Sequence, residues 1–512
     1  MILFSVFEAI CLVVFFCYLE YYILNIYQQE HYDYKKFVKI LPTYYFKKVY
    51  TDILYICLIL ILFNNIYHSL IIMILTIFIL IKPTKYIIKL KYTPRIIRLI
   101  LTTIILVLVP FILIRNAHLI LFIIEIFFLP FILLSSSIIN EPIEIMIKKH
   151  YLKKATKKYY ENQNMVKIAI TGSYGKTTTK NILYHLLSNH YICLATPKSY
   201  NTLMGITKTI NESLKTTTEV FIMEMGAFKK GEIRQMVKEF PPNISVITEI
   251  GPQHLSTFKS IEGVLNAKLE IISNQPYESS LVVNTSNKYL KNLNILSIND
   301  IIGVGYEPSD NYYIKDVHTS CGKTSFIIVN NNQELLIETP LLGEHNAINI
   351  LICYGIIQAL KKYNIDITDQ EFINRIKSVP QVPHRLEYQE INNIHIYDDS
   401  YNSNLAGFSS AINLFKEIRT KKVIITPGIV DGGTKEKEIN EEIALKLISQ
   451  FDDIYLIRNK VIVYYVKVFN EHHQKYKIFN SFNDAFQTFK NNYNEEVSLL
   501  IENDLPDNFL ER

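Results

Sequence analysis

The sequence predicts a multi-domain protein in which an N-terminal α-helical transmembrane region precedes two α/β domains. Three observations lead to this fold class. The 512 residues are 49% hydrophobic and 20% charged, a balance that excludes a disordered chain and argues against a wholly soluble enzyme. Most of the excess apolar content lies before residue 140. From about residue 151, short apolar runs alternate with amphipathic stretches, which is the pattern of domains built on a parallel sheet.

The N-terminal region holds a series of apolar runs that are candidates for membrane-spanning helices. These runs cover residues 2–27, 53–63, 70–81, 99–114 and 119–139. A helical span requires about 20 residues, so the second and third runs form either two spans or one long kinked helix. The sequence therefore allows four or five spans before charge is considered.

Basic residues decide between these two counts. They concentrate in residues 28–52, 82–98 and 148–158. The positive-inside rule puts all three segments on the cytoplasmic side, which five spans allow and four do not. We therefore predict about five transmembrane helices in residues 1–150, in the cell (inner or plasma) membrane, with the later domains in the cytoplasm. Glu125 lies inside the last run and is a candidate functional residue, since acids within membranes are costly.

A phosphate-binding loop is predicted where the soluble part begins. A β-rich run at 166–170 leads into this loop, and a helix-like stretch follows at 180–187. Backbone N–H groups at a helix start bind phosphate, a Lys adds charge, and a Thr hydroxyl reaches Mg²⁺. The spacing is G-x-x-G-K-T-T and differs from the common G-x-x-x-x-G-K-[ST]. The predicted nucleotide-binding residues are Gly172, Ser173, Tyr174, Gly175, Lys176, Thr177 and Thr178.

Further polar residues stand at the ends of predicted strands or on the helices that follow them. Glu224 ends the run 221–224, His254 lies in the segment 247–255 that ends a second strand, and Lys268 lies on a helix soon after. In the last part of the chain, a segment with Arg385 follows an inter-domain link near 377–383. The remaining segments are the helix start at 342–349, with Asn346 and Asn349, and Asp398-Asp399-Ser400-Tyr401-Asn402-Ser403-Asn404 after a strand at 394–397.

In this order, these motifs make residues 165–512 resemble the Mur ligases, the ATP-dependent amide ligases of peptidoglycan precursor synthesis. The branch that they resemble most adds D-alanyl-D-alanine to UDP-N-acetylmuramoyl-tripeptide. The resemblance implies a central ATP-binding domain at 151–380 and a C-terminal Rossmann-like domain at 381–512. It also implies an ADP-forming carbon–nitrogen ligase, which converts a carboxylate into an acyl phosphate before an amine attacks it.

The same resemblance implies roles for single residues. Thr177 and Glu224 would hold one Mg²⁺, and His254 with a carbamylated Lys268 would surround a second. A carbamate suits Mg²⁺ because it is an anionic oxygen ligand, whereas an ammonium would repel the metal. The nucleotide contacts would come from Lys176 on the β- and γ-phosphates, Arg385 on the γ-phosphate, Asp399 on the ribose, and Asn346 or Asn349 beside adenine. Outside the motif context, His254 and Lys268 would be an ordinary histidine and a solvated helix charge.

The sequence departs from the family in ways that leave the substrates open. The predicted transmembrane region stands where the soluble ligases carry a UDP-binding domain, so the acceptor is either UDP-linked or held at the membrane by a lipid. Leu405 replaces a usual Pro, and the segment 426–433 also differs. Asn201 lies where the family has a substrate-side loop, which could equally be a plain turn.

Alternative functions are a Mur-like ligase acting on another membrane-held polymer or lipid-linked acceptor, or an ATP-binding membrane scaffold without catalysis. Ligases that extend folate with glutamate share the loop, but the Glu224 and Asp399 segments fit the peptidoglycan branch better. The six Cys include no C-x-x-C pair, which counts against a related branch with a zinc ribbon. The net charge of +5 is too small to suggest a nucleic-acid partner. The expected partners are ATP, a peptidoglycan precursor, an amino acid or dipeptide amine, and membrane lipid.

Overall fold

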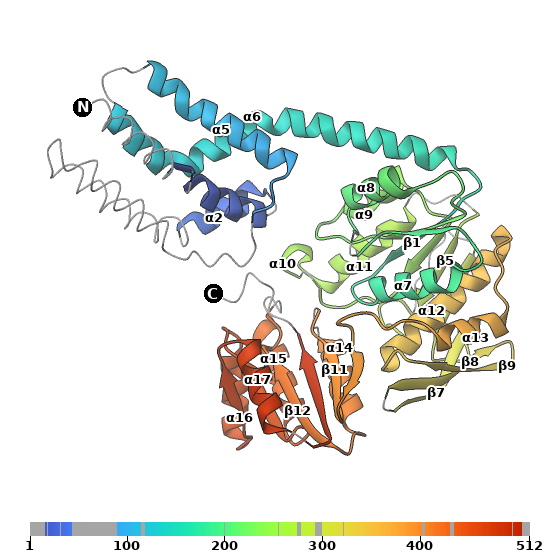
Figure 1. The fold of residues 1–512 in the computed structure, drawn as a ribbon. Helices are drawn as coiled ribbons and strands as arrows, with labels where there is room; N and C mark the ends of the chain where they lie inside the picture. Colours follow the sequence, from blue (N-terminus) through green and yellow to red (C-terminus); the bar gives the residue numbers. More distant parts are fainter. Residues whose placement is uncertain are drawn as a thin grey trace. The chain divides into compact units, whose positions relative to one another are not determined.

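The structure is a computed structural model of the 512-residue chain, and it divides into two compact units, residues 1–150 and 151–512. Figure 1 shows the elements in sequence order, from blue to red. The structure describes residues 16–17, 19–30, 32–42, 90–113, 118–198, 200–253, 255–273, 278–291, 300–320, 322–401, 405–430, 435–493 and 495–503. The apolar runs predicted at 53–63 and 70–81 lie outside these ranges, as does His254.

The first unit is helical in its described part. Its helices include α2 (Tyr34–Leu41), α5 (Pro94–Leu113) and α6 (His118–Glu161), and residues 19–29 are helical as well. Helix α6 is 44 residues long and continues well past the apolar run predicted to end at 139. Within it, Phe128–Glu161 is long and apolar enough to cross a membrane, and it is one such segment among the described residues. The multi-span transmembrane region stays a prediction.

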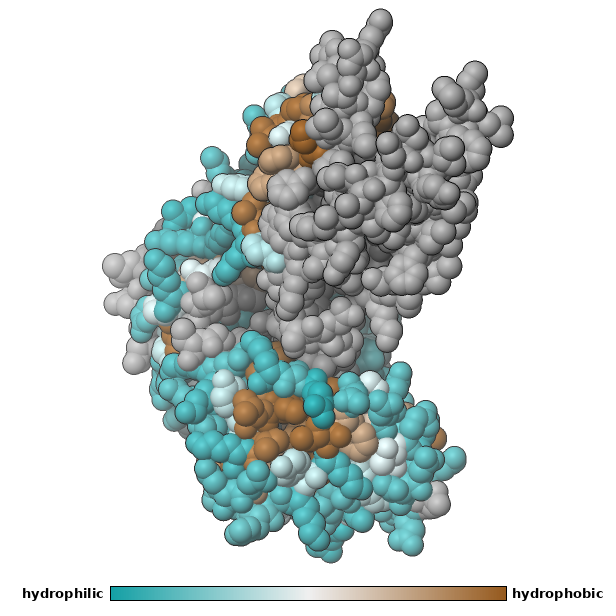
Figure 2. Space-filling model, turned by 90° about the vertical axis from the view of Figure 1, so that its left-hand side faces the viewer, coloured by the Kyte–Doolittle hydropathy of each residue, from teal (hydrophilic) through white to brown (hydrophobic). Residues whose placement is uncertain are grey.

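Both polar and apolar side chains of α5 and α6 are buried inside this unit, and further apolar ones are exposed. The apolar core includes Ile96 and Leu99 of α5 and Leu129 and Leu133 of α6. Thr103 and Ser136 share a hydrogen bond of 2.9 Å, and both side chains are fully buried. The Asn140 amide donates to the Thr102 hydroxyl at 2.8 Å. The exposed side chains of α5 include Leu101 and Ile105, and Figure 2 shows brown hydrophobic surface on described helices of this unit. The unit thus combines a buried apolar core with exposed aliphatic side chains along α5.

The second unit begins with a nine-stranded sheet in the order β2-β3-β1-β4-β5-β6-β7-β8-β9. The pairs from β2 to β7 are parallel, and β8 and β9 add antiparallel partners at one edge. The strands are β1 (Val166–Thr171), β2 (Cys193–Ala195), β3 (Val220–Glu224), β4 (Ile244–Ile247), β5 (Ser280–Asn284), β6 (Asp300–Gly305), β7 (Tyr312–Ser320), β8 (Lys323–Asn330) and β9 (Gln333–Thr339).

Helices cover both faces of this sheet, because successive side chains of a strand point to opposite sides. Ile168 and Ile170 of β1 pack in one core with α7, α12 and α13, whereas Ala169 packs in the other with α8, α9, α11 and the last turns of α6. The bounds are α7 (Lys176–Leu187), α8 (Leu203–Ser213), α9 (Glu232–Glu239), α10 (Leu255–Phe258), α11 (Ile261–Leu269), η2 (Glu270–Ile272), α12 (Glu344–Leu360), η3 (Lys361–Tyr363) and α13 (Asp369–Lys377).

A second sheet of six strands follows, in the order β10-β11-β15-β12-β13-β14. Its strands run parallel except for the β10–β11 hairpin. The strands are β10 (Glu387–Ile391), β11 (Ile394–Asp399), β12 (Lys421–Thr426), β13 (Asp453–Ile457), β14 (Lys477–Phe479) and β15 (Val497–Glu502). The helices are α14 (Leu405–Phe415), α15 (Glu436–Leu447), α16 (Ile462–Glu471) and α17 (Phe482–Asn492).

The two sheets confirm the α/β class predicted for this part of the chain. One boundary in the prediction is wrong: helix α7 begins at Lys176, not at Lys180. Gly175 stands at the N-cap with φ of +81°, so the chain enters the helix directly from the glycine turn. This earlier start places Lys176 and Thr177 in the first turn, where backbone N–H groups are free of helical partners.

Candidate nucleotide and metal site

The loop between β1 and α7 is shaped by two glycines at positive φ. Gly172 has φ of +153° and Gly175 has φ of +81°. A Cβ at Gly172 would lie 2.1 Å from the Thr248 hydroxyl oxygen, and one at Gly175 would lie 2.6 Å from Oδ1 of Asn349. Only glycine fits both the conformation and the space. The loop therefore turns tightly enough to present the N-terminus of α7 to an anion.

Lys176 folds back over this loop. Its Nζ donates to the carbonyl oxygens of Gly172, at 2.7 Å, and Ser173, at 3.1 Å. Burial lowers the pKa of Lys176 to about 8, Glu224 opposes this shift, and Arg385 adds to it. The ammonium group of Lys176 thus lies within the loop that precedes α7. A phosphate bound there would supply negative charge and stabilise the charged form of Lys176.

Glu224 ends β3 and is held by three side chains. Its side chain is 1% exposed. Oε2 accepts a hydrogen bond from the Thr177 hydroxyl at 2.9 Å and pairs with Nζ of Lys180 at 3.2 Å. Oε1 accepts a hydrogen bond from Nδ2 of Asn201 at 3.2 Å. The structure therefore brings together Thr177 and Glu224, both predicted metal ligands, and a hydroxyl and a carboxylate are oxygen ligands that Mg²⁺ accepts.

Lys180 was not among the predicted site residues, and Asn201 was left as either a substrate-side residue or part of a turn. A sequence signal existed for Lys180. It follows Lys176 by four residues, and positions four apart share one face of a helix. No comparable signal exists for Asn201, since the β2–α8 connection is brought to Glu224 only by the fold.

Lys268 is buried on α11. Its side chain is 2% exposed, and burial lowers its pKa to about 7. The charge of Lys176 lowers this pKa further, while Glu232 and Glu270 oppose the shift. Lys268 and Lys176 therefore lie close enough to affect each other's charge. The predicted partner of Lys268, His254, lies outside the described residues.

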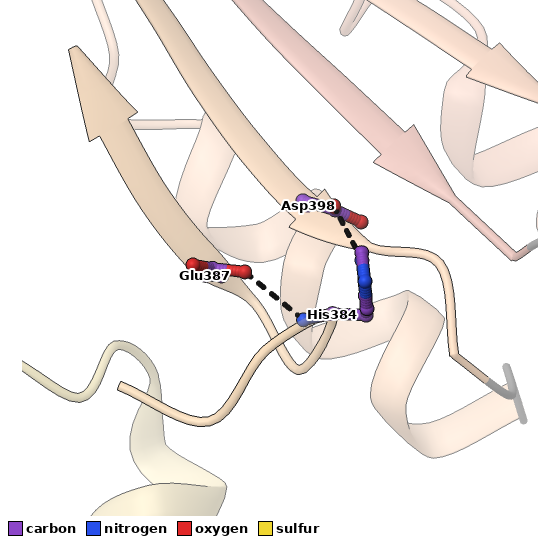
Figure 3. A group of neighbouring side chains, drawn as sticks. All are labelled: His384, Glu387 and Asp398. Carbon is purple, nitrogen blue, oxygen red and sulfur yellow. Dashed lines mark hydrogen bonds and ion pairs between the residues drawn. The ribbon is translucent and has the colours of Figure 1, made fainter. Parts of the chain in front are cut away.

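The turn that carries Arg385 is braced against the end of β11, as Figure 3 shows. The ring of His384 contacts Asp398, with Nδ1 and Oδ2 2.8 Å apart, and the His384 backbone N–H donates to Glu387 at 3.1 Å. The backbone N–H of Leu386, two residues after His384, donates a hydrogen bond to Asp399 at 3.1 Å. The turn therefore fixes Arg385 beside Asp399.

The three side chains in Figure 3 also form a cluster whose potential ligand atoms lie within 4.8 Å of one another. Each already has a role in bracing the turn, so we assign no metal to it. Asp399, the next residue after Asp398, is partly buried. Burial raises its pKa, and Arg385 opposes the rise. The guanidinium of Arg385 also lies over the ring of Tyr401, 4.4 Å from its centroid.

A cavity of about 810 Å³ joins these elements. The predicted residues that line it come from both α/β domains: Tyr174, Gly175, Thr178, Asn346, Asn349, Arg385 and Asp399. Its volume is within the range of sites for small molecules and cofactors. Gly172, Ser173, Lys176, Thr177, Glu224 and Lys268 are not among its lining residues. The cavity thus brings together part of the predicted nucleotide contacts, while Lys176 and the described predicted metal ligands do not line it.

Two asparagines of α12 connect the cavity wall to α7. Nδ2 of Asn349 donates to Oδ1 of Asn346 at 3.2 Å, and Oδ1 of Asn349 accepts from the Thr179 hydroxyl at 3.3 Å. The lining also includes Thr248 and Glu249, which prediction missed. They follow β4 directly, as Glu224 ends β3, and the ends of parallel strands meet at one edge of a sheet.

Comparison with known proteins finds matches to the part of the chain that carries this site. Residues 170–357 match the family model described as the Mur ligase middle domain. The match covers 188 of the 512 residues, so this part of the chain is similar to the middle domain of the Mur ligases. Relatives similar to it include the UDP-N-acetylmuramoyl-tripeptide–D-alanyl-D-alanine ligases of Buchnera aphidicola, 28% identical over 278 residues, and Bacillus subtilis, 27% identical over 294 residues. The matches cover 52% and 57% of this chain, and the chain spans 58% and 62% of the length of those relatives.

A solved structure has the same fold over a larger share. The MurF ligase of Thermotoga maritima, in complex with ADP, superposes with a TM-score of 0.62 and 23% identity, over 70% of this chain and 80% of that one. At this identity the likeness concerns the fold. The family resemblance predicted from the motifs is confirmed. The roles of the single residues stay predictions supported by their geometry.

We predict that Gly175→Ala weakens nucleotide binding about tenfold or more, because a Cβ there meets Asn349 and a left-handed φ strains the loop. Gly231→Ala is the matched control. Gly231 also has a positive φ, of +94°, but a Cβ there meets nothing within 4 Å. Isothermal titration with ADP measures both variants. Equal affinities for the two would contradict the prediction.

Proposed function

We propose that the chain is a membrane-anchored, ATP-dependent amide ligase that releases ADP and acts in peptidoglycan precursor synthesis. The observation that carries this proposal is the cavity that the phosphate loop shares with Arg385 and Asp399. One side offers a helix N-terminus to phosphates, and the other offers a guanidinium and a carboxylate. This pairing suits a nucleoside triphosphate, whose phosphates need cations and whose ribose offers hydroxyl donors.

The reaction proceeds in two steps. A carboxylate oxygen of the acceptor attacks the γ-phosphorus of ATP, which forms an acyl phosphate and releases ADP. An amine then attacks the acyl carbon, and inorganic phosphate leaves as the amide forms. Catalysis of this kind depends on positioning and on stabilising negative charge. The N–H groups at the start of α7, Lys176 and Arg385 supply these positive groups.

Mg²⁺ would be held by Thr177 and Glu224, where it would neutralise the phosphate oxygens. The residues fit such an ion, since a hydroxyl and a buried carboxylate already lie 2.9 Å apart. We further propose that Lys268 is carbamylated. Its amino group is buried beside Lys176, so a carbamate would turn a pair of like charges into a pair of opposite charges.

The acceptor proposed here is the UDP-N-acetylmuramoyl-tripeptide named for the curated relatives, with D-alanyl-D-alanine as the amine. An acceptor linked to a lipid is the alternative, and the apolar first unit favours including it in any assay. A scaffold that binds ATP without ligating is a weaker candidate, since the buried charges at Lys176, Glu224 and Lys268 are costly for a protein that only binds.

The proposed membrane anchor is supported by the exposed aliphatic side chains of α5 and by the long apolar segment of α6. Ile97, Leu101 and Ile105 of α5 follow one another at intervals of four residues, and each is about half exposed. The polar groups of α5 and α6 hydrogen-bond to each other inside. Small polar contacts between helices with apolar outer faces are typical of helices packed in lipid.

For the reaction, we predict amine-dependent release of ADP by the full chain in detergent. Lys176→Met should lower the rate about 100-fold or more, because it removes a fixed cation at the transferring phosphate. The assay supplies UDP- or lipid-linked tripeptide, with and without D-alanyl-D-alanine, and mass spectrometry identifies the amide. Turnover that does not depend on any amine, with both acceptors present, would contradict the ligase.

For Lys268, we predict a carbamate signal in ¹³C NMR after incubation with labelled bicarbonate. The signal should be lost in Lys268→Ala and kept in the control Lys238→Ala, which changes an exposed lysine of α9. Ligase activity of Lys268→Ala should fall about 10–100-fold, the usual cost of a lost group around a metal. A fully active Lys268→Ala variant would rule out the carbamate.

For the anchor, we predict that the full chain stays in the membrane pellet after washing with alkaline carbonate and with high salt. A protein held by charge alone is released by salt. Protease added to sealed, right-side-out vesicles should leave residues 151–512 intact, because we expect them in the cytoplasm. Release of the chain into the carbonate supernatant would contradict the anchor, and digestion of this part would contradict the orientation.

A further inference from the structure

The buried lysine that the proposed reaction does not use is Lys180. Its side chain is 2% exposed, and it lies one helical turn after Lys176 on α7. Nζ pairs with Oε2 of Glu224 at 3.2 Å and donates a short hydrogen bond to the carbonyl oxygen of Lys198. An ammonium in such a place is costly, and an apolar side chain of similar size would often stabilise the fold as well or better. This cost suggests a role beyond packing.

Lys180 contacts the same carboxylate oxygen of Glu224 as Thr177, which is a predicted metal ligand. Thr177 and Lys180 lie three residues apart on α7, so their side chains point from neighbouring positions of one face. Both reach Oε2 of Glu224, while Asn201 reaches Oε1. With both oxygens held, the carboxylate of Glu224 has a single orientation before any metal arrives.

The second partner of Lys180 extends this arrangement to the β2–α8 connection. Lys198 and Asn201 both belong to that connection. The carbonyl oxygen of Asn201 also accepts a hydrogen bond from the Gly226 N–H at 2.7 Å, just beyond β3. Lys180 and Asn201 therefore attach the connection to Glu224 at two points, and Gly226 adds a third.

We propose that Lys180 is a positioning residue, whose buried ammonium fixes the Glu224 carboxylate and the Lys198 carbonyl as one unit. This proposal rests on the proposed function to the extent that Glu224 binds Mg²⁺. It adds that the metal-binding carboxylate and the β2–α8 connection are held together by one cation. Removing that cation should weaken metal binding and loosen the connection in the same variant.

The experiment measures ADP affinity of the full chain in detergent, first in EDTA and then over a series of Mg²⁺ concentrations. For Lys180→Met we expect the half-saturating Mg²⁺ concentration to rise about tenfold or more, as for the loss of a charge-assisted hydrogen bond. Affinity in EDTA should change less than about twofold, because the phosphate loop is intact. Lys180→Arg should recover most of the Mg²⁺ response, and the exposed control Lys238→Met should match the wild type.

Hydrogen exchange at the Gly226 amide gives a second readout that does not depend on the metal. Exchange should become faster in Lys180→Met and return toward the wild-type rate in Lys180→Arg. If Lys180→Met does not fold, as shown by lost ADP binding in EDTA, Lys180→Gln takes its place with the same expected shifts. An unchanged Mg²⁺ response and unchanged exchange would overturn the proposal. Absence of ligation with normal Mg²⁺-dependent ADP binding would instead overturn the proposed function.

Discussion

The buried carboxylate of Glu224 is the constraint on which the rest of the site depends. It lies at the end of β3, out of contact with water, so its charge must be balanced by groups that the fold brings to it. Thr177 and Lys180 come from α7, and Asn201 comes from the β2–α8 connection. A helix, a strand and a loop are thereby fixed to one another by a single side chain. The start of α7, and with it the phosphate loop, takes its position from this network.

The parallel sheet explains why these groups meet. The carboxyl ends of its strands lie at one edge, so residues that follow different strands become neighbours there. Glu224 follows the core of β3, Gly172 follows β1, and Thr248 follows β4. The close approach of Gly172 to Thr248 is a direct result, and it leaves no room for a side chain. The second α/β domain contributes Arg385 in a different way. Arg385 lies on a turn that is hydrogen-bonded to the residues at the end of β11.

The first unit follows another physical rule. Its helices bury hydroxyl and amide groups, which hydrogen-bond to each other, beside an apolar core, and they also expose aliphatic side chains. Water would penalise such a surface, whereas lipid would not, because lipid chains are as apolar as the side chains that face them.

The sequence by itself determined the α/β class of the second unit, the strand–glycine turn–helix order of the predicted phosphate loop, and the resemblance to the Mur ligases. These follow from local patterns, because a glycine turn between a strand and a helix can be recognised from consecutive residues alone. It placed the start of α7 four residues too late, because propensity alone does not show where Gly175 turns the chain. The roles of Lys180, Asn201 and Thr248 were decided by the tertiary structure. Each acts on a partner far away in the chain, and only the packing of helix and loop against the sheet edge sets those distances.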